Sequence, residues 1–139
     1  MTIKLKENER LDDLVLDSMK LIQRNDEFCF SLDTVLLARF GDVIKGPTLD
    51  LGTGTAAIPL ILSARGAREI TALELNPVMA DIAARNVVLN GKESCVVVRR
   101  GDYRRIEELF PAGSFSVVYA NPPYRELFLS LIHISEPTR

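Results

Sequence analysis

Short apolar runs recur along the chain from residue 47 onward, and longer mixed stretches separate them. Four of these runs predict strands: TLDL (48–51), EITALE (69–74), SCVVVR (94–99) and FSVVYA (115–120). Helices are expected between the strands, over residues 56–65, 76–90 and 106–110. Gly66 and Gly91 suit the ends of the first two helices, and Asn76-Pro77 suits the start of the second. Apolar strands separated by helices predict an α/β fold, a parallel sheet with helices on both faces.

The first 46 residues follow another pattern and are expected to form a hairpin and helix extension before this sheet domain. Residues 9–24 are mixed in character, which predicts a packed helical or irregular start. The segments MKLIQ and FCF, separated by RNDE, are expected to pair as a hairpin. Asp33 is expected to cap a helix over residues 34–40.

Composition limits the possible functions. The 139 residues carry a formal net charge of −2, which argues against adhesion of the whole domain to nucleic acid and leaves room for a local basic patch. Four arginines between residues 99 and 105 could contact RNA phosphates or lie in a solvated loop. No apolar run approaches a membrane span, and the polar start does not suit a secretory signal, so a cytoplasmic protein is expected. Because the sequence contains only one histidine, His133, a metal site is not expected.

A glycine-containing segment, LDLGTGTAA, stands where the first predicted strand turns into a helix. Gly52 and Gly54 allow a sharp backbone turn and let a ligand approach the main chain closely. Glu74 ends the next predicted strand, where a carboxylate can accept hydrogen bonds from both hydroxyls of a ribose. These three residues predict an adenosine-cofactor site at the turn.

Two cofactors fit this site, and the residues alone leave the choice open. The pattern Gly52-x-Gly54-x-x-Ala57 loosely matches the fingerprint that holds a dinucleotide pyrophosphate. S-adenosyl-L-methionine has no phosphate, and its positive sulfonium and amino group would favour an acid such as Asp50 beside the turn. Asp102, after the third predicted strand, could reach the adenine amino group or instead cap a helix or turn.

A stiff corner of Asn121, Pro122, Pro123 and Tyr124 follows the fourth predicted strand. Proline fixes its own φ and holds the preceding residue extended, so the Asn121 side-chain carbonyl and the Pro122 main-chain carbonyl form two fixed acceptors. Two such acceptors suit an exocyclic –NH2 group and favour a nitrogen lone pair aimed at an incoming methyl. Asn121 cannot ionise, so its role would be orientation and electrostatic stabilisation. Tyr124 would stack a flipped base.

Four segments, in the order LDLGTGTAAIPL, LELNP, RRGDY and NPPY, resemble class I S-adenosyl-L-methionine-dependent methyltransferases that methylate amino groups. The resemblance covers nearly all of residues 8–128 and implies a Rossmann-like fold. It implies that the cofactor is held by Asp50, Gly52, Gly54, Glu74 and Asp102. It also implies a catalytic loop of Asn121, Pro122, Pro123 and Tyr124, and a segment near the cofactor that contains Phe30 and Asp33.

The segment from residue 9 to residue 40 is similar to that of bacterial enzymes that methylate N6 of the adenosine next to the anticodon of a valine tRNA. That similarity implies tRNA as the substrate. Two other functions stay open at this point. One is methylation of a glutamine side-chain amide on a protein release factor, and the other is a dinucleotide-binding oxidoreductase module.

The last eleven residues, LSLIHISEPTR (129–139), continue no pattern in the chain and resemble a translated sequencing adapter. The domain of the methyltransferase family is therefore expected to occupy residues 47–128 and to be truncated after the fourth strand. An uncovered edge on that strand would invite aggregation. We expect such a fragment to bind cofactor, if it folds, with weak or no turnover.

Overall fold

The computed structural model describes residues 3–14, 18–25, 32–40, 43 and 45–121. An N-terminal hairpin consists of β1 (Glu9–Asp13) and β2 (Lys20–Arg24), and α1 (Leu32–Arg39) follows it. A second sheet contains β3 (Thr48–Leu51), β4 (Ile70–Glu74), β5 (Val96–Arg100) and β6 (Val117–Ala120). The remaining helices are α2 (Ala57–Ala64), α3 (Pro77–Leu89), the 3-10 turn η1 (Tyr103–Arg105) and α4 (Ile106–Leu109).

The second sheet confirms the four expected strands and their parallel arrangement. Its order is β5-β4-β3-β6, and every neighbouring pair is parallel. The chain therefore moves outward from β3 through β4 to β5 and then returns to the other side of β3. This reversal creates a topological switch point between β3 and β6, the place where open α/β sheets usually bind ligands.

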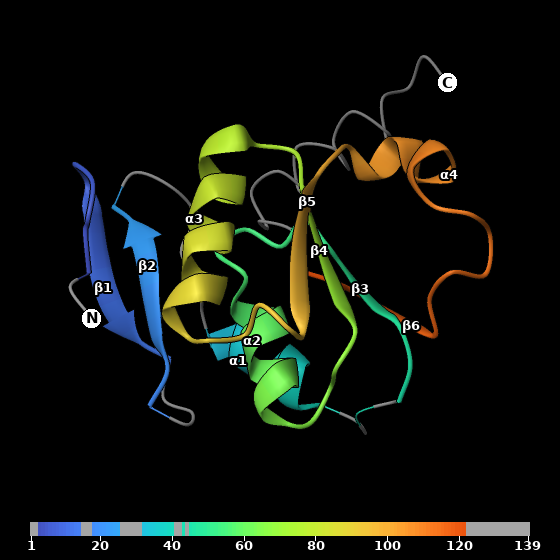
Figure 1. Ribbon diagram of the computed structural model, residues 1–139, viewed down its shortest axis with the longest axis horizontal. Helices are drawn as coiled ribbons and strands as arrows, with labels where there is room; N and C mark the ends of the chain where they lie inside the picture. Colours follow the sequence, from blue (N-terminus) through green and yellow to red (C-terminus); the bar gives the residue numbers. More distant parts are fainter. Residues whose placement is uncertain (1–2, 15–17, 26–31, 41–42, 44, 122–139) are drawn as a thin grey trace, which may run out of the picture.

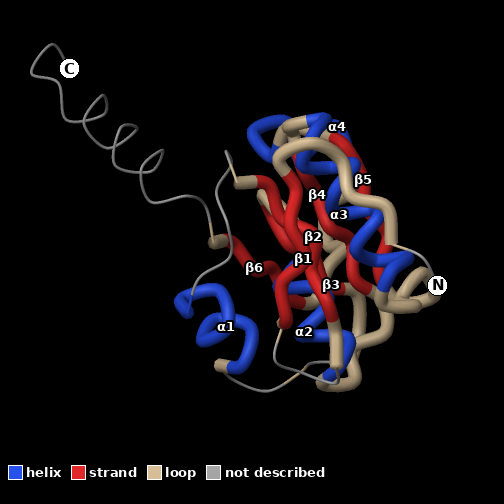
Figure 2. Tube along the Cα trace, turned by 90° about the vertical axis from the view of Figure 1, so that its left-hand side faces the viewer, coloured by secondary structure: helices blue, strands red, loops and turns tan. Residues whose placement is uncertain are grey.

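The helices cover the two faces of this sheet unequally (Figure 1). α2 and α3 pack on one face, where one apolar cluster joins Ile70, Ala72 and Val96 to Ile61 and Val87. α1 packs on α2, as Figure 2 shows, and contributes Ala38 to the same cluster. On the other face, the short α4 lies at the carboxyl ends of the strands. A side chain at Gly101 would meet Leu109 of α4 at 2.9 Å and Leu73 of β4 at 3.1 Å, so a glycine allows this contact.

Local sequence signals account for the long helix α3. The Asn76 side chain accepts hydrogen bonds from the main-chain nitrogens of Val78, at 2.9 Å, and Met79, at 3.4 Å. Pro77 follows at the first helical position, where its missing N–H costs nothing. The expected cap and start are thus confirmed. Within the described ranges, no helix is long and apolar enough to cross a membrane.

The N-terminal hairpin differs from the expected one. β2 pairs antiparallel with β1, with Glu9 opposite Arg24 and Asp13 opposite Lys20. The expectation of a helical or irregular start over residues 9–24 is therefore wrong. The expected pairing of MKLIQ with FCF stays a prediction, because FCF lies outside the described residues. Opposite charges at both ends of the ladder favour the observed pairing, and hydrophobic periodicity does not reveal them.

A partly buried ion pair holds the hairpin against α3. The Glu9 side chain is only 1% exposed and accepts a hydrogen bond from Arg85 Nη1 at 2.9 Å, while Arg85 Nη2 contacts its other oxygen. The main-chain nitrogen of Lys6 donates to the same carboxylate at 2.7 Å. The hydrogen bonds from Arg85 lower the pKa of Glu9 despite its burial. The pair therefore joins β1 to a helix of the main domain.

Replacing Glu9 with Gln should lower the free energy of unfolding by about 1–3 kcal/mol at neutral pH, because Arg85 loses a charged partner in a buried setting. Because the folded-state pKa is lowered, the wild-type advantage is present above the ordinary value of 4.5 and is lost as pH falls through the folded value. Urea unfolding at neutral and acid pH measures both effects.

Glu108→Gln is the matched control, because Glu108 pairs with Arg105 in solvent, with side chains 65% and 68% exposed. Its cost should stay below about 0.5 kcal/mol. Equal costs for the two substitutions would contradict the importance of the Glu9–Arg85 pair.

Candidate cofactor and catalytic site

Most of the predicted site residues that the structure describes gather at the carboxyl edge of the central sheet. Leu51 of β3 stands level with Leu73 of β4 on one side and with Ala120 of β6 on the other. The turn that starts at Gly52 is therefore flanked by Glu74 and Asn121. Asp102 lies just beyond the end of β5, the next strand outward.

Five predicted residues are not part of this group. Phe30, Pro122, Pro123 and Tyr124 lie outside the described residues. Asp33 is exposed in the first turn of α1, which begins at Leu32, so it is not the helix cap that was expected. Its predicted place near the cofactor stays a prediction.

The glycine turn has the backbone shape that its composition predicts. Gly52 and Gly54 have φ angles of 64° and 61°, in the left-handed region that favours glycine. Ala56 also has a left-handed φ, 71°, although it has a side chain, and α2 begins after it rather than at it. The strand-to-helix connection is therefore a tightly curved segment.

Glu74 is tied directly to this turn. Its Oε1 accepts a hydrogen bond from the Gly54 nitrogen at 2.8 Å, and its Oε2 accepts one from the Asn76 nitrogen at 3.0 Å. A carboxylate offers about four acceptor positions, so each oxygen can still accept a second hydrogen bond. The side chain is thus held in one orientation and keeps capacity for the two hydroxyls of a ribose.

Asp50 is buried beneath the turn, with a side chain that is incompletely paired. Its Oδ2 accepts a hydrogen bond from the Thr53 hydroxyl at 2.6 Å, whereas its buried Oδ1 has no partner among the described residues. Burial raises the pKa of Asp50 to about 7, and the Thr53 hydrogen bond opposes that shift. A carboxyl group that lacks a donor at Oδ1 is suited to a positively charged ligand group.

Asp102 acts as the cap of the 3-10 turn η1. Its Oδ1 accepts from the Arg104 main-chain nitrogen at 3.0 Å, and the Arg104 guanidinium contacts both carboxylate oxygens at 2.6–3.0 Å. These hydrogen bonds lower the pKa of Asp102 to about 2. The capping role that the sequence allowed is therefore present, and contact with an adenine stays a prediction.

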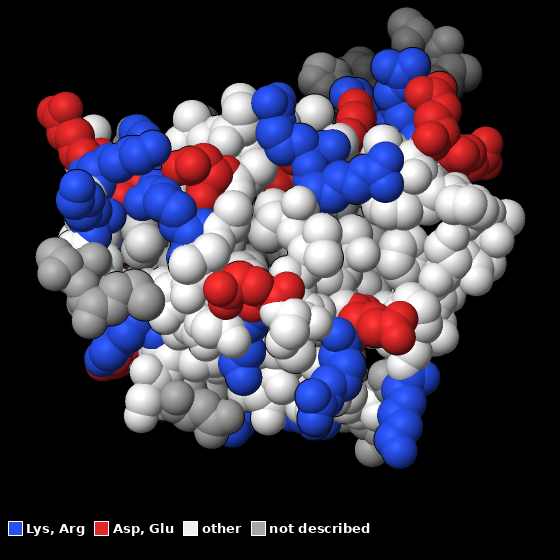
Figure 3. All heavy atoms as spheres, in the orientation of Figure 1, with Lys and Arg blue, Asp and Glu red and all other residues white. Residues whose placement is uncertain are grey.

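Most of the arginine cluster is engaged locally. Arg99 lies 4.7 Å from the centroid of the Phe110 ring and donates to the Leu109 carbonyl at 3.1 Å. Arg105 pairs with Glu108 at 3.1 Å, and Arg104 pairs with Asp102 as described above. Figure 3 shows positive and negative side chains interspersed on the face in view. These contacts favour the interpretation as a solvated surface over a dedicated phosphate site.

Asn121 makes a contact that sequence reasoning missed. Its Nδ2 donates to the hydroxyl oxygen of Thr34 on α1 at 2.9 Å, a contact that does not use Oδ1. Thr34 is 5% exposed and stands beside Asp33 in the segment FSLDT. The sequence gives no sign of this contact, because its two residues are 87 positions apart along the chain.

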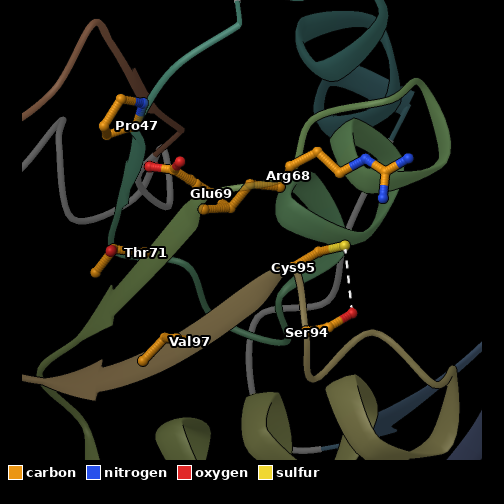
Figure 4. A pocket seen from close by; sticks show the side chains of 8 residues that line it. Pro47, Arg68, Glu69, Thr71, Ser94, Cys95 and Val97 are labelled. Atoms are coloured by element: carbon orange, nitrogen blue, oxygen red, sulfur yellow. Dashed lines mark hydrogen bonds between the residues drawn. The ribbon is translucent and has the colours of Figure 1, made fainter.

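A separate pocket of about 230 Å³ lies at the opposite edge of the sheet, at the amino ends of β4 and β5 (Figure 4). Its lining includes Glu69, Thr71, Cys95 and Val97. It contains none of the predicted site residues, so we assign it no part in the site. Among the described residues, no group of three or more His, Cys, Asp or Glu side chains could hold a metal ion.

The sheet order, the glycine turn and the acidic end of the next strand define a Rossmann-like methyltransferase fold. Solved structures agree with this class. A Pyrococcus abyssi tRNA (uracil-54, C5)-methyltransferase in complex with S-adenosyl-L-homocysteine superposes with a TM-score of 0.66 at 20% identity, over 87% of this chain and 30% of that one. Methanocaldococcus jannaschii Trm5 in complex with adenosine gives 0.66 at 15% identity, over 94% and 40%.

Residues 33–134 match the family described as Conserved hypothetical protein 95, and the chain belongs to that family. A tRNA1(Val) (adenine(37)-N6)-methyltransferase from a Flavobacteriaceae bacterium is 31% identical over 106 residues, which are 75% of this chain and 45% of that protein. A putative protein N5-glutamine methyltransferase from Methanocaldococcus jannaschii is 30% identical over 90 residues, 65% of this chain and 43% of that protein. The chain spans less than half the length of these relatives. The predicted resemblance to the tRNA-methylating enzymes is confirmed.

The raised pKa of Asp50 predicts an unusual pH dependence. The unfolded carboxyl ionises near its ordinary value of 3.8, whereas the folded carboxyl keeps its proton until about pH 7. The free energy of unfolding should therefore fall as pH rises between these values, by about 1.4 kcal/mol per pH unit for one such group. Asp50→Asn should flatten this slope in urea unfolding measured from pH 5 to pH 8.

Asp81→Asn provides the comparison, because Lys6 and Arg85 hydrogen bonds outweigh burial and lower the pKa of Asp81. Asp81 titrates below pH 5, so the dependence of the unfolding free energy on pH between pH 5 and pH 7 should be the same in Asp81→Asn as in the wild type. An unchanged slope in Asp50→Asn would show that Asp50 is ionised in the folded protein at acid pH.

Proposed function

We propose that this chain forms the cofactor-binding part of a cytoplasmic methyltransferase that transfers a methyl group from S-adenosyl-L-methionine to the N6 amine of an adenosine in tRNA, next to the anticodon of a valine tRNA. The observation that carries the proposal is the position of Asn121. It follows β6 directly beside the glycine turn that follows β3, at the switch point of the sheet. A methyl-donor site and an amine-orienting side chain therefore meet at one edge.

Three acids fit the chemistry of this cofactor. The unpartnered Oδ1 of buried Asp50 suits the amino group or sulfonium, and Glu74 retains acceptor positions for the ribose hydroxyls. Asp102 lies beyond β5, where it could meet the adenine amino group, although Arg104 already contacts both of its oxygens. The bound cofactor supplies an electrophilic methyl group. A dinucleotide pyrophosphate would instead bring negative charge to the glycine turn above Asp50, which disfavours the oxidoreductase alternative.

Asn121 would act on the methyl acceptor. Its Nδ2 is committed to Thr34, so its Oδ1 is the atom left to accept an N–H of an exocyclic amine. That hydrogen bond would aim the nitrogen lone pair and stabilise the positive charge that develops on nitrogen. Asn does not ionise, so the amine proton must leave to solvent or to another group. In this proposal the Pro122 carbonyl is the second acceptor. The two prolines, Pro122 and Pro123, make the corner rigid, and Tyr124 provides an aromatic face on which the base stacks.

The names of relatives support tRNA as the substrate, and one of them supports a second candidate. Proteins named tRNA1(Val) (adenine(37)-N6)-methyltransferase also include one from Bacteroides fragilis, 32% identical over 93 residues. The putative N5-glutamine methyltransferase of similar identity favours a protein glutamine amide as the alternative acceptor. A glutamine amide also presents an –NH2 group, so Asn121 could orient either substrate.

Cofactor binding tests the first half of the proposal. The wild-type chain should bind S-adenosyl-L-methionine in isothermal titration calorimetry, and NADH should not displace it. Glu74→Gln should weaken binding by about tenfold or more, because hydrogen bonds to a charged group contribute about 1.5–3 kcal/mol. Glu69→Gln, an exposed change before the amino end of the same strand, should leave the affinity unchanged. Tighter binding of NADH than of S-adenosyl-L-methionine would reject the proposed cofactor.

Transfer of labelled methyl groups tests the acceptor. The protein is incubated with unmodified valine tRNA transcript, with the same transcript lacking the adenosine next to the anticodon, and with a release factor. We expect weak label, in the first transcript alone, because the chain spans less than half the length of its relatives. Label in the release factor would establish the glutamine alternative, and label in both transcripts would contradict the proposed position in tRNA.

The Thr34 contact predicts how Asn121 is oriented. Thr34→Val removes the acceptor of the Asn121 amide at nearly constant volume, so the single-turnover methylation rate should fall by roughly tenfold or more while cofactor affinity is retained. Thr34→Ser keeps the hydroxyl and should recover most of the rate. Equal rates for the Val and Ser variants would show that this hydrogen bond does not position Asn121.

A further inference from the structure

Two asparagines bind the edge of the hairpin strand β2: Asn86 within α3, and Asn90, which caps the end of that helix. Asn90 accepts from the Lys20 nitrogen at 2.9 Å and donates to the Lys20 carbonyl at 2.7 Å. Asn86 accepts from the Ile22 nitrogen at 2.7 Å and donates to the Ile22 carbonyl at 3.0 Å. Four helix residues rise about 6 Å and two strand residues about 6.6 Å, so the two spacings match closely. The side-chain amides therefore replace a neighbouring strand for β2, and Figure 1 shows β2 beside α3.

Asn86 has one further contact that Asn90 lacks. Its Nδ2 also donates to the carbonyl of Thr55 at 2.9 Å, and the side chain is 0% exposed. Both amide hydrogens and the amide oxygen of Asn86 are thus engaged by main-chain groups of two distant segments. Moving either segment would leave a buried polar group without its partner, which is costly.

Thr55 belongs to the cofactor turn. It stands between Gly54, whose nitrogen donates to Glu74, and Ala56, whose φ of 71° is uncommon for a residue with a side chain. The turn is therefore held from both sides, by a carboxylate on Gly54 and by an amide on Thr55. The second constraint comes from a side chain whose other bonds go to the N-terminal hairpin.

We infer that Asn86 is a positioning residue that couples the N-terminal hairpin to the cofactor turn, so that hairpin docking and cofactor affinity depend on each other. The inference rests on the proposed use of S-adenosyl-L-methionine, because it concerns the turn that would bind it. The hairpin orients the Asn86 amide, and the amide fixes the Thr55 carbonyl and with it the curvature of the turn. Linkage then requires cofactor binding to strengthen hairpin docking by the same factor.

Asn86→Ala and Asn90→Ala provide a matched pair of variants. Both remove an amide that binds β2, but only the first frees the Thr55 carbonyl. Circular dichroism first shows that each variant is folded. In titration calorimetry, Asn86→Ala should then bind S-adenosyl-L-homocysteine about tenfold more weakly than the wild type, which is a usual size for coupling between two sites. The affinity of Asn90→Ala should stay within about twofold of the wild type, because Asn86 still binds Ile22 of β2 and the Thr55 carbonyl in that variant. Equal affinities for the two variants would overturn the coupling.

Hydrogen exchange of the wild-type chain gives a test that does not depend on a variant folding. At conditions where the Ile22 amide exchanges faster than the amides of β4, saturating S-adenosyl-L-homocysteine should slow exchange at Ile22. Unchanged exchange there would overturn the inference. A wild-type chain that binds no adenosyl ligand would reject the proposed cofactor and the coupling together, whereas normal binding with unchanged Ile22 exchange would reject the coupling alone.

Discussion

The hydrogen bond from the Gly54 nitrogen to Glu74 is the constraint on which the candidate site depends. It joins the turn after β3 to the end of β4. It therefore fixes the position of the Glu74 carboxylate relative to the main chain of the glycine turn. Parallel pairing then brings β6, and so Asn121, to the other side of the same turn. This contact and the sheet register thus define the edge at which we propose that the methyl donor and its acceptor meet.

The central domain could be predicted from the sequence because the residues that mark its strands, turns and helix starts act locally. Glycine at the turns and Asn76-Pro77 at a helix start mark boundaries within a few residues, and the four strands appear within about two residues of their predicted places. The placement of Asp50, Gly52, Gly54 and Glu74 at one edge could be predicted for the same reason, since strand ends of a parallel sheet meet there. These features follow from backbone geometry that each residue type favours or resists.

The features that were missed depend on contacts between distant residues. The β1–β2 ladder is favoured by opposite charges across the strands, and Asn121 meets Thr34 across 87 residues. Asn86 looks like an ordinary polar residue in a helix, yet it is wholly buried and bonded to two other segments. The left-handed φ of Ala56 is also set by its surroundings, since alanine itself disfavours that conformation. Such partners are determined by packing, which a local pattern does not contain.

The buried state of Asp50 has a consequence for how the protein would respond to its ligand. A carboxyl group whose pKa is about 7 still carries its proton through much of the mildly acid range. A cation seated at its free oxygen favours the ionised form, so association would expel that proton into the buffer. Ligand affinity would then rise with pH up to neutrality, and the measured heat of association would vary with the ionisation enthalpy of the buffer chosen.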